Sequence, residues 1–427
     1  MPAVCFYFQI HQPFRLRKYT VFDSDSRYFD DNMNSQLVRR IAERCYIPMN
    51  RLLLELIRST GGKFRFALSI TGTALEQLEI HAPEVVQGLH ALAQTRCVEF
   101  LGETFYHSLA ALQTRSITPP PDPSRTGTLT PPETLAPPPS PLTGAAEFRE
   151  QVELHRRMIR RLFGQTPTVF RNTELIYSNR IAGLAAELGF TGVLAEGWEP
   201  VLNNRSAAFI YRAAVDREFS NLSSPAPYLL LRNHRLSDAI AYRFADSRSP
   251  DFPLTEDKFA TLVSQIGGRL CNLFMDYETF GEHQSAATGI FDFFRALPEK
   301  LLETGNQFAL PSELLAAPDA ALAGELDVPS AISWADESRD LGAWLGNAMQ
   351  TNAAEELYKL EPLVKQHADA RLLADWRKLT TSDHFYYMST KENADGSVHA
   401  YFRPYDSPYD AYINYMNVLD NIRARAG

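Results

Sequence analysis

Short apolar runs alternate with longer amphipathic stretches over residues 1–311 of the chain. Most of the runs are followed at once by a polar or acidic residue. Seven such runs lie at residues 4–10, 64–70, 98–101, 168–170, 193–194, 228–231 and 273–275. Strands of a parallel sheet are buried on both faces and read as nearly continuous apolar runs. We therefore predict that these segments are strands of one parallel sheet.

The stretches between the runs show helical spacing of their apolar side chains. One extends from Phe148 to Phe163 and ends at Gly164, and another extends from Ile181 to Leu188 and ends at Gly189. A glycine directly after an amphipathic stretch is typical of a helix C-terminus. Alternation of strands and helices predicts an α/β fold whose sheet is either closed into a barrel or open and doubly wound.

From residue 312 onward the sequence predicts helices only, in stretches at 341–349, 355–364, 370–378 and 409–426. We expect a catalytic barrel at 1–311 and a helical domain at 312–427. A proline-dense segment at 117–143 cannot form a regular helix or an interior strand. It is interpreted as a polyproline-like surface insertion, and docking of a proline-recognising partner is the alternative that its composition leaves open.

Composition narrows the class of protein. The chain is 45% hydrophobic and 22% charged, as globular proteins are. Its net charge of -9 argues against a nucleic-acid-binding protein. No apolar run reaches membrane-spanning length, and the N-terminus reads as a strand and not as a signal peptide. The 4 cysteines are scattered without a CxxC pair, which favours reduced thiols in a cytoplasmic protein over disulfides or a metal site.

Two carboxylates follow apolar runs at positions that suit catalysis. Glu174 comes shortly after the run at 168–170, and Asp276 directly follows the run at 273–275. In a barrel the C-terminal ends of the strands surround the active site. Glycosidic bond cleavage by retention needs one ionised carboxylate and one carboxyl group that holds a proton. Arg171 can supply positive charge to Glu174, whose own negative charge would raise the pKa of Asp276. Salt bridges to loop arginines are the alternative role.

Several segments resemble the short characteristic regions of glycoside hydrolase family 57, especially its α-amylase-like members. They lie at 11–13, 102–108, 170–179, 274–284 and 333–350, and a further similar segment lies at 383–388. The segments follow the family's order and span nearly the whole chain. The proline-dense segment has no counterpart in this resemblance.

The resemblance implies a (β/α)7 barrel, an incomplete TIM-like barrel, followed by a C-terminal helical domain that closes over the cleft. It implies hydrolysis of α-1,4-glucans by double displacement, without a metal or other cofactor. Glu174 falls on the family's nucleophile and Asp276 on its acid/base. The expected substrate-binding residues are His11, Glu103, His107, Glu278, Trp334, Asp336 and Asp340.

Other functions remain open at this point. Glucanotransferases, branching enzymes and galactosidases share these motifs with amylases. A glucan-binding protein without turnover would use the carboxylates only to hold sugar hydroxyls. A zinc site of His11, His107 and Asp276, as in polysaccharide deacetylases on a similar barrel, is disfavoured because the chain has no HxxxH spacing.

Overall fold

The computed structural model describes residues 1–112, 143–316, 318, 321–367, 369–391 and 404–427. The proline-dense segment predicted at 117–143 lies, apart from its last residue, outside the described residues. In the part of the chain that is described, no helix combines the length and the hydropathy needed to cross a membrane.

Seven parallel strands form the barrel, and each corresponds to one of the predicted apolar runs. They are β1 (Ala3–Ile10), β2 (Phe66–Ile70), β3 (Val98–Phe100), β4 (Val169–Arg171), β5 (Gly192–Glu196), β7 (Tyr228–Arg232) and β8 (Leu270–Asp276). Pairing runs β3–β2–β1–β8 in one sheet and β7–β5–β4 in the other. The two sheets meet at a Gly102–Phe170 bridge and at the hydrogen bond from the Asn233 nitrogen to the Asn272 oxygen, 2.9 Å long. The seven predicted strands are confirmed.

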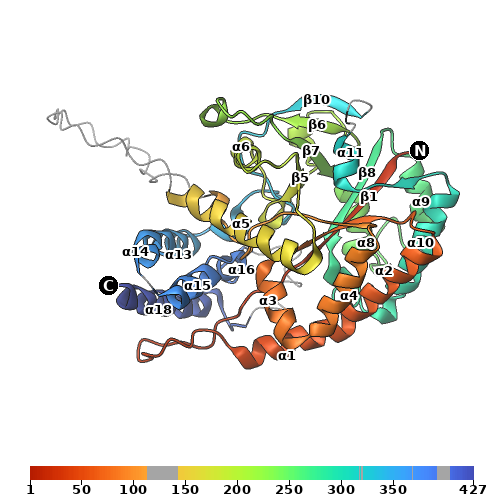
Figure 1. Cartoon of the computed structure of the whole chain (residues 1–427). Coiled ribbons are helices and arrows are strands. Elements are labelled where there is room, and N and C mark those ends of the chain that lie inside the picture. Colours follow the sequence, from red (N-terminus) through yellow and green to blue (C-terminus); the bar gives the residue numbers. More distant parts are fainter. Residues whose placement is uncertain (113–142, 317, 319–320, 368, 392–403) are drawn as a thin grey trace.

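Helices pack around the outside of the barrel, as the apolar strands require (Figure 1). They include α1 (Asp31–Ile41), α2 (Ile47–Ser59), α3 (Gly72–His81), α4 (Pro83–Gln94), α5 (Thr143–Phe163), α6 (Asn179–Glu187), α7 (Glu199–Leu202), α8 (His234–Ala241), α9 (Glu256–Ser264), α10 (Ile290–Glu303) and α11 (Pro311–Ala316). A π-helical turn at Ala42–Tyr46 joins α1 to α2. The predicted helices that end at Gly164 and Gly189 are α5 and α6, and both glycines adopt positive φ angles of 69° and 77°.

Three further strands were not predicted: β6 (Ile210–Ala213), β9 (Gln307–Phe308) and β10 (Leu322–Leu326). All three are short and leave little apolar pattern in the sequence, although β6 is paired on both sides, by β7 and β10. Because β10 pairs with β6, the prediction of helices only from residue 312 onward is wrong at β10. The domain boundary between residues 311 and 312 stays a prediction. The chain after Leu326, whose described regular elements are helices, is called the helical part.

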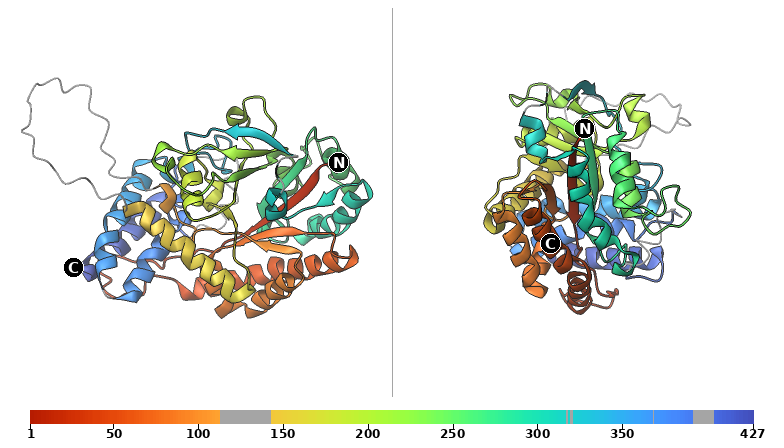
Figure 2. Two further views of the ribbon diagram at one scale, coloured as in Figure 1. Left: turned by 45° about the horizontal axis from the view of Figure 1, so that its top comes forward. Right: turned by 90° about the vertical axis from the view of Figure 1, so that its right-hand side faces the viewer.

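The helical part lies beside the barrel, around the C-terminus and on the side away from the N-terminus (Figures 1 and 2). Its helices are α12 (Gly342–Leu345), α13 (Ala348–Lys359), α14 (Glu361–Gln366), α15 (Ala370–Leu379), α16 (Ser382–Tyr386) and α18 (Pro408–Ala426). Two predicted helices are each divided. Asn347 is extended and caps α13 with Gln350, which ends α12 early, and Pro362 in the first turn of α14 separates it from α13.

Candidate active site

A layer of polar side chains covers the upper end of the barrel interior. Successive side chains of a strand point to opposite faces, so every second residue points inward. The lower inward positions are apolar and include Cys5, Tyr7, Ala67, Leu101, Val169, Leu194, Leu230 and Phe274. The next inward positions hold Gln9, Ser69, Glu103, Arg171, Glu196, Arg232 and Asp276, one from each strand or its extension. Register supports this arrangement, because Asp276 pairs with Gln9 and Arg232 pairs with Glu196.

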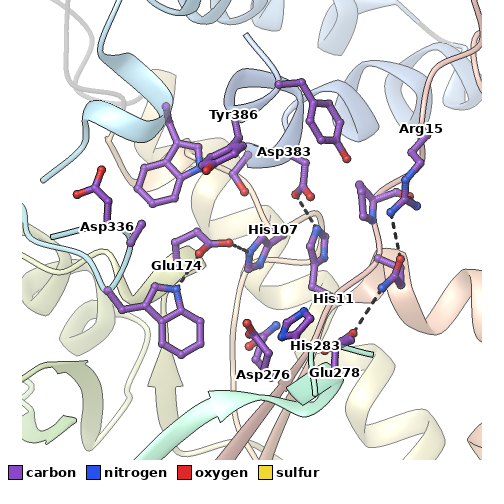
Figure 3. Close-up of a pocket in the computed structure, with 18 of the residues that line it drawn as sticks. His11, Arg15, His107, Glu174, Asp276, Glu278, His283, Asp336, Asp383 and Tyr386 are labelled. Atoms are coloured by element: carbon purple, nitrogen blue, oxygen red, sulfur yellow. Dashed lines mark hydrogen bonds and ion pairs between the residues drawn. The ribbon is translucent and has the colours of Figure 1, made fainter. Parts of the chain in front are cut away.

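A pocket opens above this layer, between the barrel and the helical part (Figure 3). The barrel contributes Gln9, His11, Gln12, Pro13, Arg15, His107, Glu174, Tyr242, Asp276, Glu278 and His283 to its lining. The chain after β10 contributes Trp334, Ala335, Asp336, Trp344, Ser382, Asp383, Tyr386 and Tyr387. Both parts of the chain are therefore needed to form the pocket.

Glu174 reaches the pocket from a strained turn after β4. Its φ and ψ angles are 54° and 30°, in the left-handed region that few residues other than glycine adopt. One carboxylate oxygen lies 2.9 Å from Nε2 of His107, and the other accepts a 2.8 Å hydrogen bond from Nε1 of Trp334. Burial alone would raise the pKa of Glu174, but the bonds from His107 and Trp334 and the charge of Arg171 lower it to about 2.

His107 links Glu174 to a second buried carboxylate. Its Nδ1 lies 3.5 Å from Glu103, which also accepts a 2.5 Å hydrogen bond from Ser69. Burial opposes the imidazolium form, but contacts with Glu103 and Glu174 outweigh it and raise the pKa of His107 to about 9. His107 is therefore protonated at neutral pH, and Glu174 faces a fixed positive charge.

The ring of His11 stacks on that of His107, with 4.0 Å between the ring centroids. Its Nδ1 lies 2.9 Å from the Thr71 hydroxyl, and its Nε2 lies 2.9 Å from a carboxylate oxygen of Asp383. Burial and the neighbouring charge of His107 lower the pKa of His11. The stacked pair thus consists of one neutral and one protonated imidazole.

Asp276 ends β8 and is in a different environment from Glu174. Burial raises the pKa of Asp276 to about 7, and the negative charge of Glu174 adds to the rise. The next acidic residue, Glu278, accepts hydrogen bonds from the Tyr46 hydroxyl and, at 3.4 Å, from Gln12. Burial and the charge of Asp276 raise the pKa of Glu278 to about 8. Glu174 is therefore ionised near neutral pH, whereas Asp276 and Glu278 in the same pocket take up a proton at or just above it.

The sequence of the chain matches those of known glycoside hydrolases. The sequence model described as glycosyl hydrolase family 57 matches residues 5–325. A protein of Methanocaldococcus jannaschii that is provisionally named an alpha-amylase is 36% identical over 430 residues, which is 97% of this chain and 83% of the relative. The chain belongs to glycoside hydrolase family 57.

Solved structures of a glucanotransferase and a branching enzyme have folds similar to that of this chain. A 4-alpha-glucanotransferase from Thermococcus litoralis superposes with a TM-score of 0.64 at 13% identity, over 98% of this chain and 60% of that chain. A family 57 branching enzyme from Pyrococcus horikoshii also gives a TM-score of 0.64, at 14% identity, over 98% of this chain and 88% of that chain. At these identities the likeness shows the fold alone, a (β/α)7 barrel followed by a helical region, as the sequence predicted.

Most of the residues expected to form the site of this family 57 glycoside hydrolase come together. Glu174, Asp276, His11, His107, Glu278, Trp334 and Asp336 all line the pocket. Two expected residues lie outside its lining. Glu103 is fully buried beneath the pocket and contacts its lining through His107 and Gln9. Asp340 has a side chain that is 58% exposed and lies 3.8 Å from Lys391.

The largest omission from the predicted site of this family 57 chain is Asp383. It belongs to a segment at 383–388 whose resemblance to the family was recognised, but no role was assigned to it. The side chain extends from α16 and lies beside His11. Burial alone would raise the pKa of Asp383, but contact with His11 reverses the effect and holds it well below its usual range. Gln9, Gln12, Arg15, Tyr242, His283, Trp344, Tyr386 and Tyr387 also line the pocket and were not predicted as site residues.

His11, His107 and Asp276, the residues of the alternative zinc site, lie in this same pocket. Both ring nitrogens of His11 have partners, and Nε2 of His107 contacts Glu174. In the described part of the chain, no three His, Cys, Asp or Glu side chains are grouped so that they could hold a metal ion.

Proposed function

We propose that this family 57 enzyme is a retaining hydrolase of α-1,4-glucans, of the α-amylase type. The observation that carries the proposal is the opposite protonation of two carboxyl groups in one pocket. The pKa of Glu174 is lowered to about 2, whereas the pKa of Asp276 is raised to about 7. Double displacement needs this division between an ionised nucleophile and a proton donor.

Glu174 serves as the nucleophile in the first step. Its carboxylate oxygen bonds to the anomeric carbon while the glycosidic C–O bond breaks. The electron pair of that bond passes to the leaving oxygen, which takes the proton from Asp276. The products are a glycosyl ester on Glu174 and a carboxylate on Asp276.

In the second step Asp276 serves as the base. It takes a proton from water, the water oxygen bonds to the anomeric carbon, and the ester bond to Glu174 breaks. Both carboxyl groups then have their original protonation. If a sugar hydroxyl replaces water, the same residues give a 4-α-glucanotransferase or a branching enzyme, which is the alternative function.

The remaining pocket residues support the sugar and the carboxylates. His11, His107, Glu278, Trp334 and Asp336 are the proposed substrate contacts, because their side chains line the pocket beside the two carboxyl groups. A protonated carboxyl group offers a donor to a sugar hydroxyl, and an ionised one offers acceptors. The helical part after Leu326 is proposed as a second domain that completes the cleft. A cytoplasmic location is proposed because all 4 cysteines are buried and unpaired.

Product analysis with maltoheptaose tests the proposal. Shorter maltooligosaccharides with new reducing ends, released initially as the α-anomer, are expected from the wild type and not from Glu174→Gln. A ladder of shorter and longer products would favour the glucanotransferase alternative. Binding without turnover in the wild type would instead support a glucan-binding protein, and a Glu174→Gln variant with unchanged activity would exclude Glu174 as nucleophile.

A further inference from the structure

Arg171 lies in the polar layer of the barrel interior that also holds Asp276, one of the two proposed catalytic carboxyl groups. It is the last residue of β4, and its side chain is fully buried. Its backbone nitrogen donates a 2.8 Å hydrogen bond to the carbonyl oxygen of Gly102. This bond sets Arg171 beside Glu103, in the same polar layer as Asp276 and three residues before Glu174.

The guanidinium group of Arg171 has no hydrogen-bonding partner among the described residues, for any of its three nitrogens. Among the described residues, the guanidinium makes a cation–π contact with the ring of Trp334, whose centroid is 5.0 Å from the guanidinium carbon. Arg232 in the same layer differs, because it donates to the Phe274 oxygen at 2.8 Å and pairs with Glu196 at 3.1 Å. A buried charge without such bonds is costly unless charges nearby balance it.

The charges that face Arg171 come from several strands. The positive charge of Arg171 lowers the pKa of Glu103, Glu174 and Asp276, in each case in addition to larger effects led by burial. Titratable and charged groups that act on Glu174, Asp276 or their neighbours in the layer include Tyr7, Glu103, His107, His155, Arg171, Arg232 and Glu278. Asp383 and His11 form a further pair beside His107. Two arginines, Arg232 and Arg339, pair with the two carboxylates of Glu196 and Asp238.

We propose that Arg171 is a positioning residue that acts as a fixed counter-charge, shared by Glu174 and Asp276 as negative charge moves between them. The inference rests on the proposed double displacement. Before the reaction, Glu103 and Glu174 are negative, while His107 and Arg171 are positive. In the glycosyl-enzyme, Glu174 is an uncharged ester and Asp276 carries the negative charge instead. In both states two negative groups face two positive groups. The negative charge therefore moves from Glu174 to Asp276 without a change in the net charge of these side chains.

The geometry suits this role because the guanidinium is not committed to either carboxyl. A bidentate bond to Glu174 would favour the state before the reaction and would oppose transfer of negative charge to Asp276. A counter-charge that acts through space on both groups stabilises each in turn. Hydrogen bonds to Glu174 come instead from His107 and Trp334.

The first experiment compares the pH dependence of kcat/KM for maltoheptaose in the wild type, Arg171→Lys and Arg171→Met. Loss of the positive charge raises the pKa of Asp276, so the alkaline limb of Arg171→Met should shift upward by about 1 pH unit. Arg171→Lys keeps the charge and should keep the limb within a few tenths of a pH unit. The surface variant Arg248→Met, whose partner is the exposed-loop residue Asp246, is the matched control and should leave the limb unmoved. An unmoved alkaline limb in folded Arg171→Met would overturn the proposal.

A second experiment tests the interaction between the charges of Arg171 and Glu174 through protein stability, without any need for catalysis. The midpoint of thermal unfolding is measured for Arg171→Met, Glu174→Gln and the double variant. Removing Arg171 alone leaves an excess negative charge, whereas removing both charges restores the balance. The double variant should therefore unfold at a higher temperature than Arg171→Met, even if the latter is unfolded at 25 °C. Additive losses in the double variant would contradict the counter-charge role. A wild type that does not cleave the sugar would count against the proposed function alone.

Discussion

The indole nitrogen of Trp334 donates a 2.8 Å hydrogen bond to the carboxylate of Glu174, and the backbone nitrogen of Trp334 donates to the carbonyl oxygen of Glu174 at 3.3 Å. Trp334, which follows β10 in the chain, therefore holds both the side chain and the strained backbone of the proposed nucleophile. Its ring also contacts the guanidinium groups of Arg171 and Arg232, at 5.0 and 5.5 Å. We infer that the main role of Trp334 is to hold the carboxylate of Glu174 in place and to lower its pKa.

Replacing Trp334 by Phe should lower kcat more than it changes KM. The ring remains, but one of the two hydrogen bonds to the ionised carboxylate is lost. A hydrogen bond to a charged group contributes roughly 1.5–3 kcal/mol, so kcat should fall by about 10- to 100-fold. Steady-state kinetics with maltoheptaose measures this change.

Trp376→Phe is the matched control for this variant. Trp376 is also a buried tryptophan that donates one hydrogen bond, to the Leu357 carbonyl oxygen at 2.9 Å, but it lies in the helical part outside the pocket lining. We expect it to alter stability and leave kcat nearly unchanged. Equal losses of kcat in the two variants would mean that Trp334 acts only through folding.

Activity should decline above neutral pH as Asp276 loses its proton. Burial and the charge of Glu174 raise the pKa of Asp276 to about 7, and its protonated form is the one that donates to the leaving oxygen. The value of kcat/KM is therefore constant well below this pKa and falls about tenfold per pH unit above it. Glu174, with a pKa lowered to about 2, stays ionised throughout the usual range. A pH profile of kcat/KM between pH 4 and pH 9 tests this, since these limits bracket the higher pKa.

An α-maltosyl fluoride provides the control for the assignment of this limb. Fluoride leaves without a proton, so its displacement by Glu174 does not need Asp276 as acid. The alkaline limb should disappear for the first step with this substrate. A limb that persists unchanged would assign the titration to another group, with Glu278 the first candidate because burial raises its pKa to about 8.

The barrel could be predicted from the sequence because its strands are buried on both faces. Runs of apolar residues marked all seven strands, and the polar residue after each run pointed to the pocket end. Glu174 and Asp276 could be identified in this way, supported by the family resemblance. The short strands β6, β9 and β10 have no such pattern, so β10 was missed within a region that was predicted to contain helices only.

Contacts between distant segments could not be predicted from spacing. The carboxylate of Asp383 meets His11 across most of the chain length, and the guanidinium of Arg171 has no hydrogen-bonding partner among the described residues because of how the interior layer is arranged. Left-handed backbone at His107 and Glu174, with φ angles of 53° and 54°, also arises from tertiary contacts and not from residue preference. The contacts of His107 and Asp383 set their charges, which the sequence did not predict, whereas the ionised Glu174 and the raised pKa of Asp276 were expected from their neighbours.

Asp383→Ala should weaken catalysis although Asp383 is in the helical part. It leaves Nε2 of His11 without its carboxylate partner and removes a negative charge from the pocket. We expect kcat/KM to fall by roughly 10- to 100-fold, the loss typical of a hydrogen bond to a charged group. Asp340→Ala is the control, because the exposed ion pair of Asp340 with Lys391 contributes little. If Asp340→Ala caused the larger loss in kcat/KM, the sequence-based assignment of Asp340 to sugar binding would be favoured instead.

Gly281 positions the loop that follows Asp276, and its replacement should destabilise the fold. Its φ angle is 109°, and a Cβ atom there would lie 2.0 Å from the carbonyl oxygen of Arg44 in the π-helical turn that also presents Tyr46 to Glu278. Gly281→Ala should lower the free energy of unfolding by about 3 kcal/mol, from backbone strain and from overlap. Gly289→Ala is the matched control, since its φ is 83° but no atom lies within 4 Å of the added Cβ. Its loss should be about 1 kcal/mol, from strain alone. Denaturant unfolding measures both, and equal losses would show that the π-helical turn yields to the added methyl group.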